Sequence, residues 1–152
     1  MNDEYYIHQA LTQAAQAEML GEIPIGAIIV ANDEIIAATH NRTITDNDPS
    51  AHAEILALRA AGNIIKNHRL SGISLYVTLE PCIMCTGALI QARIERLVFG
   101  AYDNRVGACG SAFDLARHPK LNHHIHEIKG GVLEEECRHQ LQHFFQNKRQ
   151  KK

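Results

Sequence analysis

The sequence predicts a three-layer α/β domain built around one mixed sheet. Two observations support this fold class. Apolar runs of strand length alternate along the chain with segments whose apolar residues recur every three or four positions, the spacing of a helix with one buried face. The chain has 152 residues, of which 45% are hydrophobic, so it is long enough for one domain with a substantial core. We therefore treat residues 1–152 as a single domain.

The first part of the chain predicts a helix followed by a β-hairpin. Apolar residues recur at helical spacing from Ile7 to Ala17, with Asp3 as the capping residue before them and Gly21 as the stop after them. An Ile- and Val-rich run then predicts a strand, and the Asn-Asp pair that follows it is a turn signal. The two hairpin strands are placed over residues 25–31 and 34–39.

A polar loop and a second helix follow the hairpin. Residues 40–50 read HNRTITDNDPS, a composition that favours turns over regular structure. Ser50 is placed to cap a helix over residues 51–61, and Gly62 is placed to end it.

The second half of the chain alternates strands with helices. The strands are placed over residues 75–79, 97–101 and, with a weaker pattern, 125–129. Between the first two, Pro81 suits the first turn of a helix that runs to about Arg93. Residues 102–122 contain glycines and predict an irregular segment. A last helix is placed over residues 134–148, because acidic residues in its first turn and basic ones in its last suit the helix dipole.

The charge and the N-terminal sequence limit the classes of function. The formal net charge is −2, so any contact with nucleic acid depends on a local patch rather than on a global field. The chain begins MNDEYYIH, which lacks the apolar region of a secretory signal. The longest apolar stretch, Ile25–Ala31, is far shorter than the roughly 18–20 residues of a membrane span. We expect a cytoplasmic protein with no membrane partner, whose four cysteines are metal ligands or core residues.

Two short motifs lie at the starts of two predicted helices. The first, H-A-E, spans residues 52–54, and the second, P-C-I-M-C, spans residues 81–85. Cys82 and Cys85 are three residues apart, so on a helix they face the same side. One imidazole and two thiolates are three zinc ligands, and a catalytic zinc keeps its fourth position for water. The motifs therefore predict one catalytic zinc, Zn²⁺, held by His52, Cys82 and Cys85.

Glu54 follows His52 by two residues and is the candidate for moving protons between the zinc-activated water and a leaving amine. Each motif alone is weak, because C-x-x-C also marks structural zinc or a redox pair and H-x-E arises by chance. Together they occur in the right order and each begins a helix. This combination is the signature of zinc-dependent nucleobase deaminases.

At this point the sequence closely resembles the bacterial tRNA-specific adenosine deaminases of the cytidine-deaminase-like superfamily. The similarity extends from about residue 5 to residue 149. The matching stretches are IPIGA at 23–27, HNR at 40–42, DPSAHAEI at 48–55, YVTLEPC at 76–82, CTGA at 85–88, FGAYD at 99–103, 107–111 and FF at 144–145.

The resemblance implies a cytidine-deaminase-like fold with a five-stranded sheet, one zinc per subunit, and a homodimer whose active sites the partner chains complete. It also implies conversion of the wobble adenosine in the anticodon stem-loop of an arginine tRNA to inosine. The predicted substrate contacts are Asn41, Ile23, Ala53, Asp103, Asn104, Phe145 and Arg149.

Residues near the C-terminus offer aromatic and basic character suited to an RNA loop, whose splayed bases are what proteins usually recognise. These residues are Phe144, Phe145, Lys148, Arg149, Lys151 and Lys152. A core aromatic with a solvated tail is the alternative, and for Phe144 it is at least as strong. One of two consecutive aromatics on a helix often faces outward.

The remaining cysteines and a histidine cluster are interpreted as bystanders. Cys109 and Cys137 are placed in the core rather than at the metal. His123, His124 and His126 lack a matching acid or cysteine, which favours a solvated or tRNA-facing surface over a second metal site.

Three alternative functions remain at this stage. A guanine deaminase would carry the same zinc motifs, but a different segment is expected after the fourth strand. A cytosine or cytidine deaminase acting on free base or nucleoside is the second alternative, and a free-nucleoside cytidine deaminase more often has Cys rather than His at position 52. A non-catalytic RNA-binding subunit with structural zinc belongs to another class, and Glu54 argues against it because such a site needs no proton carrier.

Overall fold

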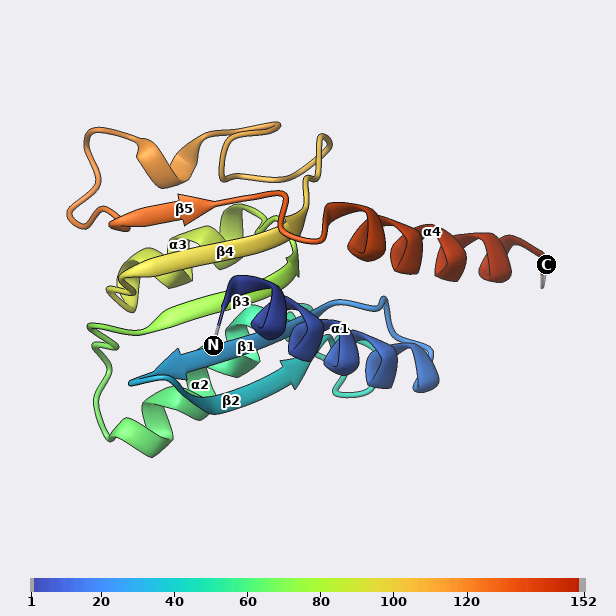
Figure 1. The fold of residues 1–152 in the computed structure, drawn as a ribbon, viewed down its shortest axis with the longest axis horizontal. Coiled ribbons are helices and arrows are strands. Elements are labelled where there is room, and N and C mark those ends of the chain that lie inside the picture. The colour runs from blue at the N-terminus through green and yellow to red at the C-terminus, as the bar shows by residue number, and fades with distance from the viewer. Residues whose placement is uncertain (1, 151–152) are drawn as a thin grey trace.

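The computed structural model describes residues 2–150 as a five-stranded mixed sheet flanked by helices, which confirms the predicted fold class (Figure 1). The elements in chain order are α1 (Asp3–Met19), β1 (Gly26–Ala31), β2 (Glu34–His40), α2 (Ala53–Ile65), β3 (Ser74–Leu79), α3 (Ile83–Gln91), β4 (Arg96–Ala101), the 3-10 turn η1 (Leu115–Arg117), β5 (Glu127–Lys129) and α4 (Glu134–Gln150).

The strand order is β2-β1-β3-β4-β5. β1 runs antiparallel to both β2 and β3, whereas β3, β4 and β5 are parallel to one another. Asn32 and Asp33 join the β1–β2 hairpin with φ angles of 51° and 62°, the left-handed conformation that a tight hairpin turn of this kind requires. The carboxyl ends of β2, β3 and β4 therefore meet at one edge of the sheet.

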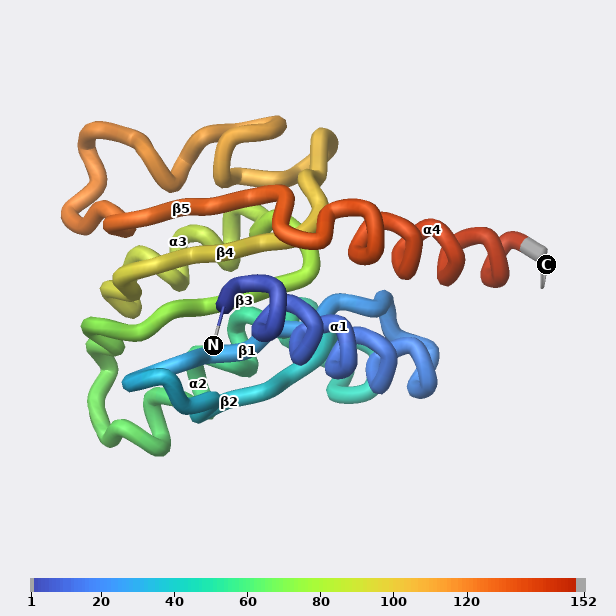
Figure 2. Tube along the Cα trace, in the orientation of Figure 1, coloured from blue at the N-terminus to red at the C-terminus, as the bar shows by residue number. Residues whose placement is uncertain are grey.

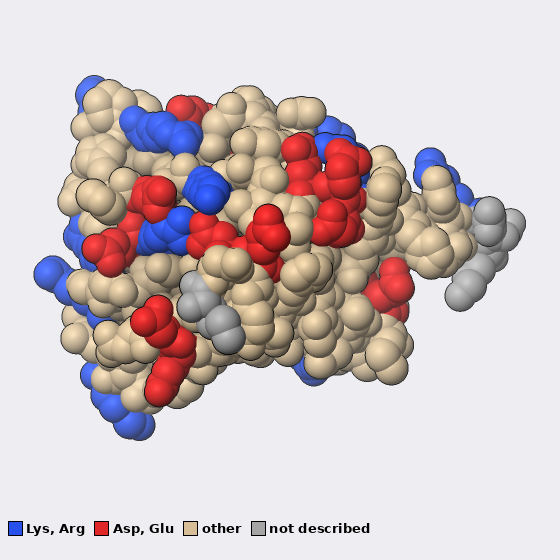
Figure 3. All heavy atoms as spheres, viewed as in Figure 1, with Lys and Arg blue, Asp and Glu red and all other residues tan. Residues whose placement is uncertain are grey.

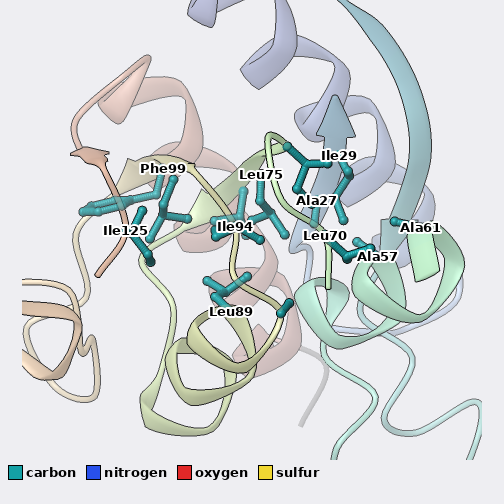
Figure 4. Packing of buried hydrophobic residues seen from close by; sticks show 14 of the residues in the cluster. Ala27, Ile29, Ala57, Ala61, Leu70, Leu75, Leu89, Ile94, Phe99 and Ile125 are labelled. Atoms are coloured by element: carbon teal, nitrogen blue, oxygen red, sulfur yellow. The ribbon is translucent and has the colours of Figure 1, made fainter. Parts of the chain in front are cut away.

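The sheet is the middle of three layers (Figures 1 and 2). α1 covers one face, and α2 and α3 cover the other. Alternate residues of β1 serve the two faces: Ile28 belongs to the cluster under α1, and Ile29 belongs to the cluster under α2 and α3. Figure 4 shows the second cluster, in which Leu75 and Phe99 of the strands pack with Leu89 of α3.

Small residues let the helices approach the sheet closely. Ala53, Ala57 and Ala61 of α2 are spaced by four and are fully buried, so they form the face that packs on the strands. A Cβ atom at Gly26 would lie 2.0 Å from the carbonyl oxygen of Ala10, so the contact between α1 and β1 admits only glycine. This close packing fixes the ends of β1 and α2 that border the site described below.

Three predicted helix starts are wrong by one or two residues. Pro81, expected in the first turn of α3, precedes the N-cap residue Cys82 and lies outside the helix. Asn2, rather than Asp3, caps α1 and accepts a hydrogen bond from the backbone N–H of Tyr5 at 2.9 Å. α2 begins at Ala53 rather than at residue 51, because the Ser50 hydroxyl donates to Asp48 at 2.8 Å instead of capping the helix.

The predicted ends of α2 and α3 are also displaced. α2 continues through Gly62 to Ile65, and Lys66 ends it in the left-handed conformation with φ of 62°. α3 ends at Gln91, two residues before the predicted end. In the described part of the chain, no helix is long and apolar enough to cross a membrane.

Asp3 ties the start of α1 to the sheet. Its carboxylate accepts hydrogen bonds from both terminal nitrogens of Arg96 at 2.6 and 2.7 Å, from Tyr76 at 3.1 Å and from Lys129 at 3.2 Å. The hydrogen bonds from Arg96, against the opposing effect of partial burial, hold the pKa of Asp3 well below its usual range. The carboxylate therefore links α1 to β3, β4 and β5.

Replacing Asp3 with Asn should lower the free energy of unfolding by about 1–2 kcal/mol at pH 7, because a partly buried, charge-assisted network is lost. Since the folded pKa of Asp3 is depressed, its contribution is complete above the ordinary carboxyl pKa and is lost as the pH falls towards the folded value. Urea unfolding at pH 7 and pH 3 measures this. Glu4→Gln, at an exposed neighbour, is the control, and an equal effect of both variants would contradict the prediction.

Candidate active site

The predicted metal ligands meet at the sheet edge where β3 ends and where α2 and α3 begin. His52 is the N-cap residue of α2 and Cys82 is the N-cap residue of α3. Neither side chain makes a capping hydrogen bond, so both are free to point toward each other. The N-termini of α2 and α3 therefore point toward the same position, and the dipoles of the two helices favour the thiolate form of a cysteine there.

The three side chains have the spacing of a shared metal ion. His52 Nδ1 lies 3.7 Å from Cys82 Sγ and 3.4 Å from Cys85 Sγ. Tetrahedral zinc with ordinary Zn–N and Zn–S bond lengths separates an imidazole nitrogen from a thiolate sulfur by about 3.6 Å. The three ligand atoms lie within 4.8 Å of one another, and among residues 2–150 no other metal-binding group of this kind occurs. The residues therefore fit zinc in both chemistry and spacing.

The three side chains shift the pKa values of one another through their contacts. The hydrogen bond from Cys85, together with the one from His52, lowers the pKa of Cys82 to about 4. The same contact with Cys82 raises the pKa of His52. The neighbouring Cys82 and burial raise the pKa of Cys85. The protein alone therefore favours the thiolate form of Cys82 only. A bound cation would stabilise the thiolate forms of both cysteines.

Glu54 lies in the first turn of α2 beside this group. Its side chain is 4% exposed, and burial raises the pKa of its carboxyl to about 7. The nearby Cys82 acts in the same direction, whereas the charge of His52 opposes it. A carboxyl group with a pKa near neutrality can both accept and release a proton at pH 7, which is the property that a general acid–base group needs.

The group opens into a pocket of about 540 Å³, a volume within the range of small-ligand sites. The pocket brings together most of the residues predicted from sequence. These are His52, Glu54 and Cys82 with Ile23, Asn41, Asp103, Asn104 and Phe145. They come from segments far apart in the chain: the residues before β1, the end of β2, the loop after β4 and the helix α4.

Two predicted substrate residues lie outside this pocket. Ala53, the first residue of α2, is fully buried, and its carbonyl accepts a hydrogen bond from the Thr39 hydroxyl at 2.7 Å. Arg149 lines an adjoining groove of about 740 Å³ along α4. Phe145 belongs to both cavities, so the groove continues the pocket. Lys151 and Lys152 lie outside the described residues.

The two consecutive phenylalanines of α4 pack edge to face, with ring centroids 5.3 Å apart, but they differ in exposure. Phe144 is 8% exposed and is a core residue, whereas Phe145 is 37% exposed and faces the pocket. Of the two phenylalanines, only Phe144 is therefore a core aromatic, which was the alternative to an RNA contact.

Sequence reasoning missed several residues of the pocket wall. Glu80, Tyr102, Arg105 and Arg138 line it as well. A carboxylate that ends an apolar strand directly before the Pro81–Cys85 motif is a signal that could have identified Glu80. The two arginines carry no local signal, because only the tertiary fold brings the loop after β4 beside α4.

The remaining cysteines and histidines are apart from the metal group. Cys109 and Cys137 are buried, and both are free thiols, as predicted. His123 Nε2 lies 2.9 Å from the carbonyl oxygen of Ile94, and His124 Nε2 lies 2.9 Å from that of His118. The imidazoles of His123 and His124 thus each lie beside a backbone carbonyl oxygen, and among residues 2–150 the cluster does not form a group with the spacing of metal ligands. Its predicted contact with tRNA stays a prediction.

The fold and the site together define a class. A three-layer α/β domain with H-x-E and P-C-x-x-C at the N-termini of two adjacent helices is the arrangement of zinc-dependent nucleobase deaminases. Consistent with this, the family model described as the cytidine and deoxycytidylate deaminase zinc-binding region matches residues 1–101.

Similarity to individual proteins shows which kind of deaminase the chain resembles most. The tRNA-specific adenosine deaminase of Haemophilus influenzae is 50% identical over 151 residues, which cover 99% of this chain and 87% of the relative. A solved structure from work on A-to-I editing by tRNA:A34 deaminases at the wobble position of transfer RNA has a TM-score of 0.87 and 40% identity, and the match covers 90% of this chain and 99% of the other.

A guanine deaminase also shares the fold over a shorter length. The enzyme from Bacillus subtilis has a TM-score of 0.65 and 39% identity, and the match covers 67% of this chain and 66% of the other. The guanine deaminase from Nitrosomonas europaea covers 93% of this chain, but at 26% identity, whereas the Haemophilus influenzae tRNA deaminase covers 99% at 50%. The chain belongs to the zinc-binding deaminase family and, within it, to the tRNA-specific adenosine deaminases.

Proposed function

We propose that this protein hydrolyses the wobble adenosine of an arginine tRNA to inosine, releasing ammonia. The observation that supports this most is the continuity between two cavities. The pocket that holds Glu54 beside the metal ligands opens into the groove along α4, which Arg105, Arg138 and Arg149 line. A base deep in the pocket would therefore have its flanking nucleotides beside basic and aromatic side chains.

The metal ligands in the proposal are His52, Cys82 and Cys85. These three side chains would hold a zinc ion, which would lower the pKa of a water molecule to about 7 and so supply hydroxide at neutral pH. Glu54 accepts a proton from the attacking water and returns it to the amino group that leaves the base. Water and adenosine thus give inosine and ammonia, with no net change in the protein.

The base is oriented by the walls of the pocket. Asn41 is 4% exposed and lines the pocket, so its amide can satisfy polar edges of the base. Ile23 supplies an apolar surface on the same side. Ala53 remains a proposed contact with the substrate, although the whole residue is buried in the single chain.

The RNA contacts in the proposal are Asp103, Asn104, Phe145 and Arg149. Figure 3 shows acidic and basic side chains interspersed on the face that α1 covers, and the net charge of the chain is −2. Binding to the anticodon stem-loop therefore depends on few phosphate contacts and should weaken with salt less steeply than binding by a strongly basic protein. We place the reaction in the cytoplasm, where a reducing environment keeps the ligand thiols free.

A panel of substrates tests the proposed class of reaction. The zinc-loaded protein is incubated in parallel with arginine tRNA, guanine and cytidine, and the products are separated by chromatography. We expect inosine in the tRNA and neither xanthine nor uridine. Conversion of guanine with unmodified tRNA would make the chain a guanine deaminase instead.

Phe145 should contribute to RNA binding by stacking on a base. Replacing it with Ala should raise KM for the stem-loop by about 5- to 150-fold, the equivalent of roughly 1–3 kcal/mol for one base–aromatic contact. Tyr5, which is 38% exposed on α1 away from the pocket, provides the matched control Tyr5→Ala. Equal KM values for the Phe145 variant and the control would remove Phe145 from the interface.

We also propose a homodimer whose partner chain completes the active site. Apolar side chains at the start of α3 and in the loop after β4 are exposed in the single chain: Ile83 is 50% exposed, Met84 39% and Phe113 48%. A neighbouring copy of the chain would cover them.

Sedimentation at micromolar concentration should give about twice the chain mass of 16.9 kDa. Ile83→Asp should halve the mass by placing a charge in the interface. Met19→Asp, at a site 86% exposed on α1, should leave the mass unchanged. A monomer mass for the unaltered chain would contradict the dimer.

A further inference from the structure

Two buried carboxylates lie at or next to the pocket, and the proton transfers described above use neither: Glu80 lines the pocket, and Glu22 directly precedes the lining residue Ile23. Glu22 is fully buried and Glu80 is 2% exposed. An ionised carboxylate is costly to bury unless its oxygens accept hydrogen bonds. In both residues these hydrogen bonds come from a loop that forms one wall of the pocket.

Glu80 is enclosed by the loop that follows β4. Its Oε1 accepts from the backbone N–H of Asp103 at 3.0 Å and from the Ser111 hydroxyl. Its Oε2 accepts from the backbone N–H groups of Cys109 at 3.0 Å and Ser111 at 3.1 Å. A Cβ atom at Gly107 would lie 2.4 Å from Glu80 Cδ, so the loop closes tightly around the carboxylate.

This loop carries one wall of the pocket. Asp103, Asn104, Arg105 and Val106 all line it. The Asp103 carboxylate accepts from the backbone N–H groups of Arg105 at 3.0 Å and Val106 at 3.3 Å, which makes the turn rigid once its first residue is held. Glu80 therefore fixes the whole wall through the N–H of that first residue.

Glu22 plays the same part for the loop between β2 and α2. Its Oε2 accepts from both the backbone N–H and the hydroxyl of Thr45 at 2.6 Å, and its Oε1 accepts from the backbone N–H of Ile44 at 3.2 Å. Burial alone would raise the pKa of Glu22, but the hydrogen bonds from Thr45 and Ile44 outweigh it and keep the pKa below its usual value. The loop begins with Asn41 and leads to His52.

The two carboxylates are also close in sequence to site residues. Glu22 directly precedes Ile23 of the pocket, and Glu80 lies two residues before Cys82. Residues 22–23 therefore contain a pocket residue and the carboxylate that holds one loop, and residues 80–82 contain a metal ligand and the carboxylate that holds the other loop. The separation between the metal ligands and the walls is fixed by these anchors.

We propose that Glu22 and Glu80 are positioning residues that hold the two walls of the pocket at fixed places relative to the metal ligands. The consequence for substrate rests on the proposed function, because the walls are the surfaces that would grip the nucleotide and its neighbours. Glu80 is not a proton donor to substrate, since four hydrogen bonds from the protein already occupy its oxygens.

Glu22→Gln and Glu80→Gln test the proposal with nearly unchanged side-chain volume. Glutamine keeps one acceptor oxygen, while its NH₂ group faces N–H donors that it cannot accept from. Hydrogen exchange, followed peptide by peptide, should rise in residues 102–113 of the Glu80 variant and in residues 41–50 of the Glu22 variant. Each variant is the control for the other, and Glu95→Gln, at an exposed residue, should change neither segment.

Kinetics separate positioning from a general loss of folded protein. Partial unfolding lowers the active concentration, so it reduces apparent kcat and leaves KM unchanged. Displaced walls should instead raise KM for the stem-loop and lower kcat/KM at least about tenfold, because small displacements in a site cost large factors in rate. Zinc content should stay at one per chain in both variants.

Exchange that rises evenly along the chain, or an unchanged KM in both variants, would overturn the proposal. Absence of stem-loop deamination by the unaltered protein would instead contradict the proposed function. In that case the segment-specific exchange pattern still supports or overturns the anchoring of each loop by its carboxylate.

Discussion

Replacing Glu54 with Gln is expected to abolish turnover while leaving the metal and the fold in place. Glutamine has nearly the same shape but cannot accept a proton from water or return one to the leaving amine. General acid–base groups contribute about 10²–10⁴ in rate, and Glu54 would serve both transfers, so the loss should reach or exceed this range.

The measurement is kcat on the stem-loop together with zinc content and the thermal unfolding midpoint. The exposed residue Glu95 supplies the matched control Glu95→Gln, which should retain full activity. A Glu54 variant that keeps more than about a tenth of the rate would move the proton-transfer role to another residue.

Replacing Cys85 with Ser should remove the zinc and much of the stability of the fold. Serine is a poor zinc ligand, and Cys85 is fully buried, so the variant loses a metal bond and places a hydroxyl among buried groups. Metal binding and folding are linked, because the assembled ligand set does not exist in the unfolded chain.

Cys109→Ser is the matched control, because Cys109 is also buried and hydrogen-bonds to Thr86 but is not in the metal group. Metal analysis after gel filtration should find about one zinc per chain in the control and little in the Cys85 variant. Equal zinc in both variants would show that Cys85 is not a ligand.

The metal group could be predicted from sequence because its spacing is local. Cys82 and Cys85 lie within one helical turn, and Glu54 lies two residues after His52, so ligand and proton carrier are recognised without knowing the fold. The strand and helix periods likewise predicted every element of the sheet. The helix starts could not be placed in the same way, because the choice between Ser50 and His52 as N-cap depends on which other groups each side chain bonds.

The walls of the pocket could not be predicted in the same way. The hydrogen bonds of Glu22 and Glu80 join residues between 21 and 31 positions apart, and nothing in the local sequence names the partner. The only local sign of such a residue in the sequence is a carboxylate beside a strand or near a proline. The groove along α4 depends equally on the tertiary fold, which brings Arg105 beside Arg138 and Phe145.

The central claim is that a zinc site with Glu54 acts on an adenosine that is held by an RNA loop. Substrate binding energy from remote contacts can orient the reacting atom, so a truncated substrate should lose kcat as well as affinity. The direct measurement compares one zinc-loaded preparation on an anticodon stem-loop with a wobble adenosine and on free adenosine, with inosine mapped by position. We predict inosine at the wobble position and almost none from free adenosine. Comparable rates on the two substrates would contradict the account.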